Sequence, residues 1–200
     1  QTLLKITSPG VPDFYQGSEI WSYTLVDPDN RRPVDYELRM EMLRGLKEAE
    51  ERRGRADLAR ELLLNLEDGR IKMYVTWKAL TFRREQAELF ASADYHPLFA
   101  VGEMARHVCA FSRRSGSGET ITAVPRFLVR LLEHPSVPPV GGEVWKDFFL
   151  VLREGSEGAV YRNVFTGEKV PVVSRGNHSA IFLSDLFASF PLALLERVER

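Results

Sequence analysis

The sequence has 200 residues but a single cysteine, Cys109, so an internal disulfide is excluded. No run approaches the roughly 18 apolar residues of a membrane span, and no signal peptide is recognisable. A formal net charge of −1 gives no electrostatic reason to expect nucleic acid or an anionic membrane as a partner. These absences favour a globular, cytoplasmic protein in which Cys109 packs as a small buried side chain.

Histidines are few and far apart, which argues against a metal site. The four of them show none of the short spacings that metal ligands favour: His96, His107, His134 and His178. The sequence also lacks a nucleophile elbow, a P-loop and the glycine pattern of a dinucleotide-binding fold. The RRSGSGE stretch lacks the strand-to-helix context of a phosphate-binding loop and is expected to be a turn. We therefore expect neither a metal nor a cofactor.

Hydrophobic periodicity indicates a helical first half. Residues 2–7 form a short apolar run that predicts a strand, whereas residues 35–86 show helical spacing. Asp68 is the predicted N-cap of the last helix in that range. Three helices are expected, with apolar stripes at Tyr36, Met40, Leu43 and Leu46, at Leu58, Leu62 and Leu66, and at Ile71, Val75 and Ala79.

The second half has the pattern of a β protein. After about residue 90, short β-branched or aromatic runs alternate with turn signals. SGSG at 115–118 and TGE at 166–168 predict hairpin turns, and FLVRLLEH at 127–134 predicts one short helix. The pattern therefore predicts an antiparallel β-sandwich. The runs that predict its strands are HPLFAV, HVCAFSR, TITAV, DFFLVL, AVYRNVF, KVPVV and SAIFL.

The segment SPGVPDFYQGSEIWSYTLVDPDNRRPVDYE, residues 8–37, combines rigid turn residues, aromatic rings and charges. Taken alone, DPDN at 27–30 fits a turn closed by Asx hydrogen bonds and needs no function. Arg31 and Arg32 follow it directly, however, and Phe14, Tyr15, Trp21 and Tyr23 precede it in the same segment. Sugars present apolar CH faces and rings of hydroxyls, so this mixture favours a carbohydrate site over a purely structural loop.

The same segment carries a family resemblance. SPGVPDFYQGSE resembles the end of the last barrel strand and its loop in the α-amylase superfamily. LVDPDNRRPVDYELR is more specific and resembles the maltooligosyl trehalose synthase family, the (1→4)-α-D-glucan 1-α-D-glucosylmutases of that superfamily. VWKDFFLVL and residues 48–57 depart mildly from the family pattern. The match covers nearly the whole chain and continues through DGRIKMYVTWKALTFRREQAELF, YHPLFAVGEMARHVCAFSRR, AVPRF and FASFPLALL.

The resemblance implies an α+β fragment from the C-terminal end of a longer enzyme. Residues 1–90 would supply the last strand, active-site loop and helices of a (β/α)8 barrel, and residues 91–200 an antiparallel β-sandwich. The implied enzyme converts the reducing-end α-1,4 linkage of a maltooligosaccharide into an α,α-1,1 linkage. The family's catalytic carboxylates lie on earlier strands, so no catalytic residue is expected here and the chain alone is expected to be inactive. The opening Gln1, in place of Met, agrees with a piece of a longer protein.

The resemblance also assigns a substrate-binding role to the opening loop. A maltooligosaccharide is the expected partner in the full-length protein, and the loop charges could also pair with one another. The residues expected to form or support the substrate pocket are Tyr15, Glu19, Asp27, Asp29, Asn30, Arg31 and Arg32.

Two further expectations complete the sequence-based hypothesis. A non-catalytic carbohydrate-binding module is the alternative function, in which the sandwich binds glucan through an exposed Trp145 or Tyr161. The predicted strand at 2–7 would lack its barrel neighbours, and an exposed strand edge invites pairing with another chain. We therefore expect residues 1–35 to be mobile, rearranged or in contact with a second copy, and the chain to self-associate. Order is expected from about residue 70 onward.

Overall fold

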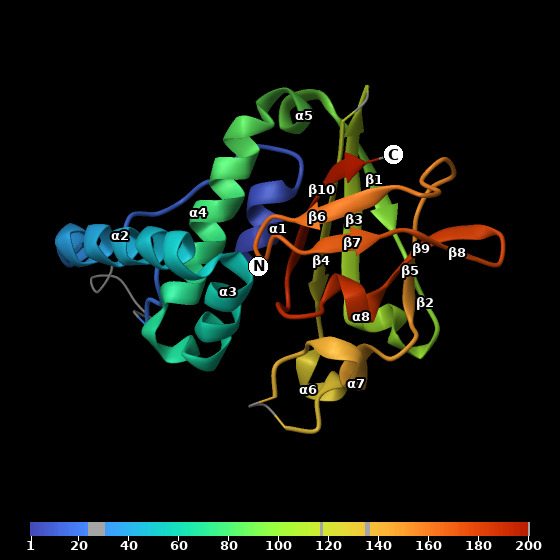
Figure 1. Cartoon of the computed structure of the whole chain (residues 1–200). Coiled ribbons are helices and arrows are strands. Elements are labelled where there is room, and N and C mark those ends of the chain that lie inside the picture. Colours follow the sequence, from blue (N-terminus) through green and yellow to red (C-terminus); the bar gives the residue numbers. More distant parts are fainter. Residues whose placement is uncertain (24–30, 117, 135–136, 200) are drawn as a thin grey trace.

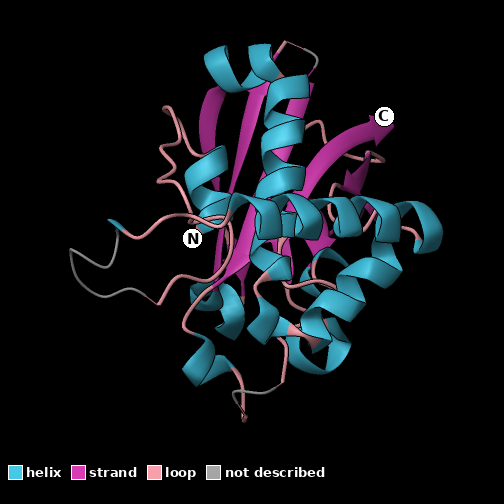
Figure 2. Cartoon of the chain, turned by 90° about the vertical axis from the view of Figure 1, so that its left-hand side faces the viewer, coloured by secondary structure: helices cyan, strands magenta, loops and turns pink. Residues whose placement is uncertain are grey.

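The computed structural model describes residues 1–23, 31–116, 118–134 and 137–199. Its elements form three layers: helices, a six-stranded sheet in the middle, and a four-stranded sheet on the far side (Figure 1). Figure 2 shows the helices of the first half lying in front of the long strands. No helix within these described ranges is long and apolar enough to cross a membrane.

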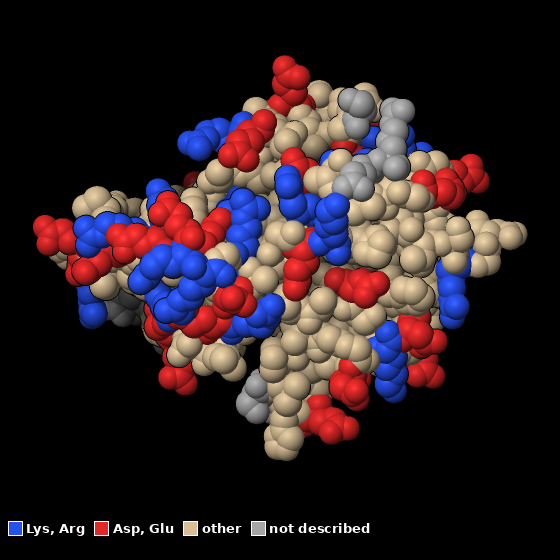
Figure 3. Space-filling view, in the orientation of Figure 1, with Lys and Arg blue, Asp and Glu red and all other residues tan. Residues whose placement is uncertain are grey.

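The three predicted helices are confirmed as α2 (Tyr36–Arg53), α3 (Arg55–Leu64) and α4 (Arg70–Glu85). Asp35 caps α2, because its carboxylate accepts the backbone N–H of Leu38 at 2.9 Å. Charged side chains of both signs cover the face of α2 and α3 in Figure 3, as expected for solvated helix surfaces.

The predicted cap of α4 is displaced by one residue. Asp68 ends a short 3-10 turn, η2 (Leu66–Asp68), and Gly69 is the N-cap residue, with a φ of +78°. The Asp68 carboxylate nevertheless accepts the N–H of Arg70 at 2.9 Å, so it still satisfies one free donor of the first turn. A further short helix, α5 (Ala87–Ser92), follows α4.

The strand predicted at residues 2–7 is wrong, because this segment is the helix α1 (Thr2–Thr7). Leu3 and Ile6 lie on one face of that helix and are buried in the helical core against α4. Within the described ranges no strand pairs with this segment, so its backbone groups are satisfied by helical hydrogen bonds instead. Arg83 adds a cap by donating to the carbonyls of Ile6 at 2.5 Å and Gly10 at 2.6 Å. The expected last strand of a barrel is thus absent from the described residues.

The second half contains the predicted antiparallel sheets. The larger sheet has the strand order β1-β3-β4-β10-β6-β7, and the smaller one β2-β5-β9-β8. Every recorded strand pair is antiparallel. The bounds are β1 (Asp94–Leu98), β2 (Ala100–Val101), β3 (Val108–Ser115), β4 (Gly118–Pro125), β5 (Phe149–Val151), β6 (Val160–Asn163), β7 (Lys169–Pro171), β8 (Val173–Arg175), β9 (His178–Phe182) and β10 (Ala193–Glu199).

Short turns and helices connect these strands. The predicted hairpins are present: Ser115 pairs with Gly118 across β3 and β4, and Gly167 turns the chain between β6 and β7 with a φ of +74°. The helix predicted at 127–134 is confirmed as α6 (Leu128–Leu131). The remaining helical turns are η3 (Glu103–His107), α7 (Gly141–Trp145) and α8 (Leu183–Leu186).

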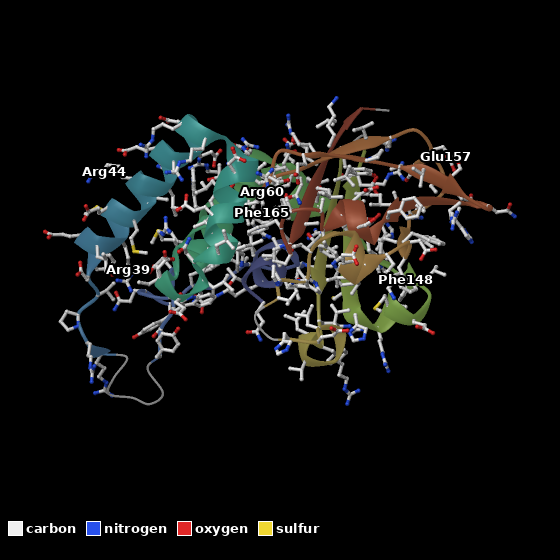
Figure 4. All side chains as sticks on the ribbon, turned by 60° about the horizontal axis from the view of Figure 1, so that its bottom comes forward. Arg39, Arg44, Arg60, Phe148, Glu157 and Phe165 are labelled. Atoms are coloured by element: carbon white, nitrogen blue, oxygen red, sulfur yellow. The ribbon has the colours of Figure 1, made fainter. Side chains whose placement is uncertain are left out.

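The six-stranded sheet is covered on both faces. On β10, Leu194 belongs to the helical core, whereas Ala193 and Leu195 belong to the core between the two sheets. Phe165, which follows β6, lies on the helical side, between α4 and the sheet (Figure 4). Cys109 on β3 is only half-buried and also packs against the helical core. The helices and the sheet therefore share one hydrophobic core across the sequence boundary at residue 90.

Candidate functional site

The opening loop is fastened to α2 by Arg39. The guanidinium donates from Nε to the Glu19 carboxylate at 3.0 Å, from Nη2 to the Gly17 carbonyl at 2.9 Å and from Nη1 to the Asp35 carbonyl at 2.9 Å. The Arg39 side chain is only 16% exposed, and Figure 4 shows it at the end of α2 nearest the loop. Because Gly17 and Asp35 lie on either side of the loop tip, one side chain joins the two arms of the loop.

Gly17 makes this close approach feasible. Its φ is +85°, which favours glycine, and a Cβ there would lie 3.1 Å from the Val34 side chain. Tyr36 adds a second link between the arms, because its hydroxyl donates to the Gln16 side-chain oxygen at 2.9 Å. The first arm is therefore held to α2 at two neighbouring residues, Gln16 and Gly17.

A second cation, Lys72 of α4, fastens the loop farther along. Its ammonium donates to the Ile20 carbonyl at 3.0 Å and lies 5.6 Å from the centre of the Trp21 ring. The Trp21 indole N–H donates to the Leu66 carbonyl at 2.5 Å, which fixes the ring at the surface. Burial lowers the pKa of Lys72, and the nearby positive charge of Lys5 lowers it further, while Glu19 opposes the shift.

The first residues of the loop are held in the same way. Lys5 of α1 lies 3.8 Å from the centre of the Phe14 ring. Arg83 of α4 holds the Gly10 carbonyl, as described above. Cations from three helices thus bind the loop, and they hold it mainly by its backbone carbonyls.

The predicted site residues fall into three groups. Glu19 is half-buried and engaged by Arg39, so it supports the loop. Tyr15 is 61% exposed, and Arg31 and Arg32 are exposed, so these side chains are accessible to a ligand. The remaining predicted residues, Asp27, Asp29 and Asn30, lie outside the described residues.

Sequence reasoning missed three of the residues that position the loop: Arg39, Lys72 and Arg83. Arg39 is the last residue of the LVDPDNRRPVDYELR motif, but its spacing from Glu19 along the chain gives no sign of the ion pair. Lys72 and Arg83 fit the polar positions of an ordinary amphipathic helix. Only their position against the loop distinguishes them from surface charges.

The alternative sugar platforms on the sandwich are excluded. Trp145 and Tyr161 are both 0% exposed, so neither ring can stack on a sugar. The Trp145 indole donates to the Pro139 carbonyl at 2.8 Å, and the Tyr161 hydroxyl donates to the Glu119 carboxylate at 2.8 Å. These contacts satisfy the polar atoms of both side chains and make them packing residues. Over the described residues, no group of His, Cys, Asp and Glu side chains is arranged to hold a metal ion.

No family model matches the chain. The similar proteins and solved structures, in contrast, include several maltooligosyl trehalose synthases. The chain is 36% identical over 195 residues to a protein of Mycobacterium tuberculosis (strain CDC 1551 / Oshkosh) assigned as a maltooligosyl trehalose synthase, covering 98% of this chain and 20% of that protein. The solved maltooligosyltrehalose synthase of Arthrobacter ramosus matches with a TM-score of 0.72 and 32% identity, over 98% of this chain and 21% of that one. An Anoxybacillus α-amylase, at 17% identity and a TM-score of 0.57, shares the fold alone. The chain spans about a fifth of the length of the relatives it matches.

Proposed function

The chain belongs to the maltooligosyl trehalose synthase family, and from this premise we propose that it forms one section of such a synthase. The proposed reaction converts the reducing-end α-1,4 linkage of a maltooligosaccharide into an α,α-1,1 linkage. The observation that carries this proposal is the match along 98% of the chain to synthases about five times as long. In this proposal residues 1–90 add a loop and helices to a catalytic barrel, residues 91–200 are its β-sandwich, and the catalytic carboxylates lie in the rest of the enzyme.

The opening loop would form part of the wall of the glucose pocket. An intramolecular transfer detaches the terminal glucose, and this glucose must turn in place before it forms the new linkage. Water must be kept out while the glycosyl intermediate waits, because hydrolysis would otherwise compete. The contacts of Arg39 and Lys72 with the described arms of the loop support that task, because they hold these arms to α2 and α4.

Arg31 and Arg32 are the proposed sugar contacts in the described part of the loop. Both are exposed, and they lie just before Asp35, whose carbonyl accepts a hydrogen bond from Arg39. A guanidinium is a planar fork of fixed donors that can bind two neighbouring hydroxyls or orient a pocket carboxylate, and lysine does not reproduce this geometry. Glu19 is proposed as a supporting residue, because its carboxylate is already engaged by Arg39.

Alanine variants in the complete synthase test this proposal. Arg31→Ala and Arg32→Ala are each expected to lower trehalosyl transfer by about tenfold or more, with little change in thermal unfolding. Arg44→Ala is the matched control, since Arg44 is an exposed α2 arginine whose nearest carboxylate, Glu41, is 4.0 Å away. Wild-type kinetics in both loop variants would show that neither arginine contacts the sugar. The 200-residue chain alone is expected to form no trehalosyl product, and turnover above a buffer blank would contradict the assignment of the carboxylates.

A further inference from the structure

A polar hollow lies where the β3–β4 hairpin, the end of β10 and the corner between α4 and α5 meet. Its volume is about 300 Å³, and Figure 1 shows these segments together in the upper part of the view, away from α2. The last recorded pair between β4 and β10 joins Thr120 and Glu196, although β10 runs on to Glu199 and β4 begins at Gly118. The hollow therefore occupies a gap between two neighbouring strands.

The strand register places two arginines on either side of one buried carboxylate. Arg114 on β3 is directly opposite Glu119 on β4. Arg197 follows the last β4–β10 pair, and its Nη1 lies 3.8 Å from the Glu119 carboxylate. Residues opposite one another in neighbouring strands project to the same face of a sheet. All three residues line the hollow, so it is flanked by two guanidinium groups.

The carboxylates at the hollow already have other donors. The Tyr161 hydroxyl donates to the Glu119 carboxylate at 2.8 Å, and Arg162 donates to the Glu196 carboxylate at 2.7 Å. The Gln86 amide also reaches Glu196, at 3.5 Å. Both acidic side chains are therefore engaged within the protein, and neither is held by Arg114 or Arg197 through a hydrogen bond.

The two arginines, in contrast, keep unused donors. Arg114 is half-buried and forms no hydrogen bond or ion pair across the part of the chain that the structure describes. The Arg197 side chain is 18% exposed, its only ion pair among the described residues is the 3.8 Å contact with Glu119, and its Nε is buried without an acceptor. Unsatisfied donors inside a protein are costly, and two guanidinium forks at one hollow suit an oxyanion.

We propose that this hollow binds a phosphate group between Arg114 and Arg197. A phosphate offers enough acceptor oxygens to engage both guanidinium forks at once. The group can arrive as the free ion or as part of a phosphate ester, whose body would contact Phe82, Gln86 and Leu89 on the helical side. None of the lining residues belongs to the opening loop, so this inference does not depend on the proposed function.

Calorimetric titration of the 200-residue chain with inorganic phosphate tests the inference. At about 0.15 M salt, we expect one saturable site with a Kd of about 1 mM or lower. Phosphate should also raise the midpoint of thermal unfolding, because a ligand that binds only the folded chain stabilises it. Glucose 6-phosphate is titrated in parallel: tighter binding than inorganic phosphate would identify an ester as the ligand, and equal or weaker binding would identify the free ion. Maltotriose, which carries hydroxyls without charge, should not compete.

Variants at the two arginines locate the site. Arg114→Gln should weaken phosphate binding about tenfold or more, and it should unfold at the wild-type midpoint without ligand, because Arg114 has no partner to lose among the described residues. Arg197→Lys keeps a positive charge beside Glu119 but loses the fork, so binding should weaken about threefold or more. Arg44→Gln, at an exposed arginine of α2, is the control for net charge and should bind as wild type does.

Three results would overturn the inference. The first is the absence of saturable phosphate binding by the wild-type chain. The second is wild-type affinity in either Arg114→Gln or Arg197→Lys, which would place the phosphate elsewhere. The third is displacement of phosphate by maltotriose, because the hollow would then recognise hydroxyls and not an oxyanion.

Discussion

The sandwich and the helical region bury their apolar side chains in different ways. Between the two sheets, Trp145, Tyr161 and Phe187 are completely buried in a core made only of residues from the second half. The helical core instead takes Phe165, Phe190 and other side chains from the sheet. At its edge Met40 of α2 is still 64% exposed.

The core between the two sheets is therefore closed by the second half alone, whereas the helical core needs side chains from both halves. The sandwich closes its core with its own two layers, as antiparallel sheets can. The helices cover one face of the middle sheet, and their other side remains available to a partner. The proposed functional loop belongs to the dependent region, where it is held by cations from the helices and where the rest of an enzyme could complete it.

The largest effect is expected where the core is self-sufficient. Trp145→Ala removes a ring that packs 5.0 Å from Phe187 and a hydrogen bond to the Pro139 carbonyl, and should lower the free energy of unfolding by about 3–5 kcal/mol. Trp21→Ala, in the loop, is the comparison and should cost about 1 kcal/mol, because that ring is 39% exposed. Urea unfolding measures both values. Similar losses for the two variants would break the contrast between the regions.

An intermediate effect is expected at the joint between the regions. The buried Tyr74 hydroxyl of α4 donates to the Phe165 carbonyl at 2.6 Å, so Tyr74→Phe leaves a buried acceptor unpaired and should cost about 1–3 kcal/mol. Tyr95→Phe, at a ring that is 47% exposed, should change stability by less than about 0.5 kcal/mol. A Tyr74→Phe chain as stable as wild type in urea unfolding would show that the helices and the sheet do not depend on this bond.

The same residue predicts a pH dependence. Burial raises the pKa of Tyr74 above its ordinary value. A pKa that is higher in the folded state means that the stabilisation is complete below the ordinary tyrosine pKa of about 10 and is lost as the pH rises through the folded value. Above pH 9 the free energy of unfolding should therefore fall less steeply with pH in Tyr74→Phe than in wild type. The same dependence on pH in both proteins would contradict this.

The smallest global effect is expected at the loop. Arg39→Lys retains the charge but cannot donate simultaneously to Glu19, Gly17 and Asp35 with the same fork. Hydrogen exchange at residues 10–23 should become about tenfold faster, while the global free energy of unfolding should change by less than about 1 kcal/mol. Arg44→Lys on the same helix should alter neither quantity. Unchanged exchange in Arg39→Lys would show that the loop is held by other contacts.

Local patterns were sufficient for much of the fold. The helices at 36–53, 55–64 and 70–85 follow from apolar spacing of three and four residues, since neighbouring turns of one helix create that stripe. The hairpins at Gly116 and Gly167 follow from turn residues that tolerate a positive φ. The family resemblance also came from the sequence alone. It directed attention to the opening loop, whose role in substrate binding stays a prediction.

The sequence pattern failed where an element depends on distant partners. The short apolar run at residues 2–7 is compatible with a strand or with a helix. Packing against α4 and the hydrogen bond from Arg83 stabilise the helix. The pattern did not predict β10, because this strand is buried on both faces and so lacks the alternation of a half-exposed strand.

Periodicity and turn residues by themselves determined the helical half and the β half, and the resemblance of quoted motifs indicated the family and the candidate loop. Tertiary structure alone decided that Trp145 is a core residue, that Glu19 supports the loop, and that Arg39 joins its two arms. The physical reason is the range of the interactions. Helical stripes and turns are formed by residues within a few positions of one another, whereas burial and ion pairing depend on neighbours that only the folded chain brings together.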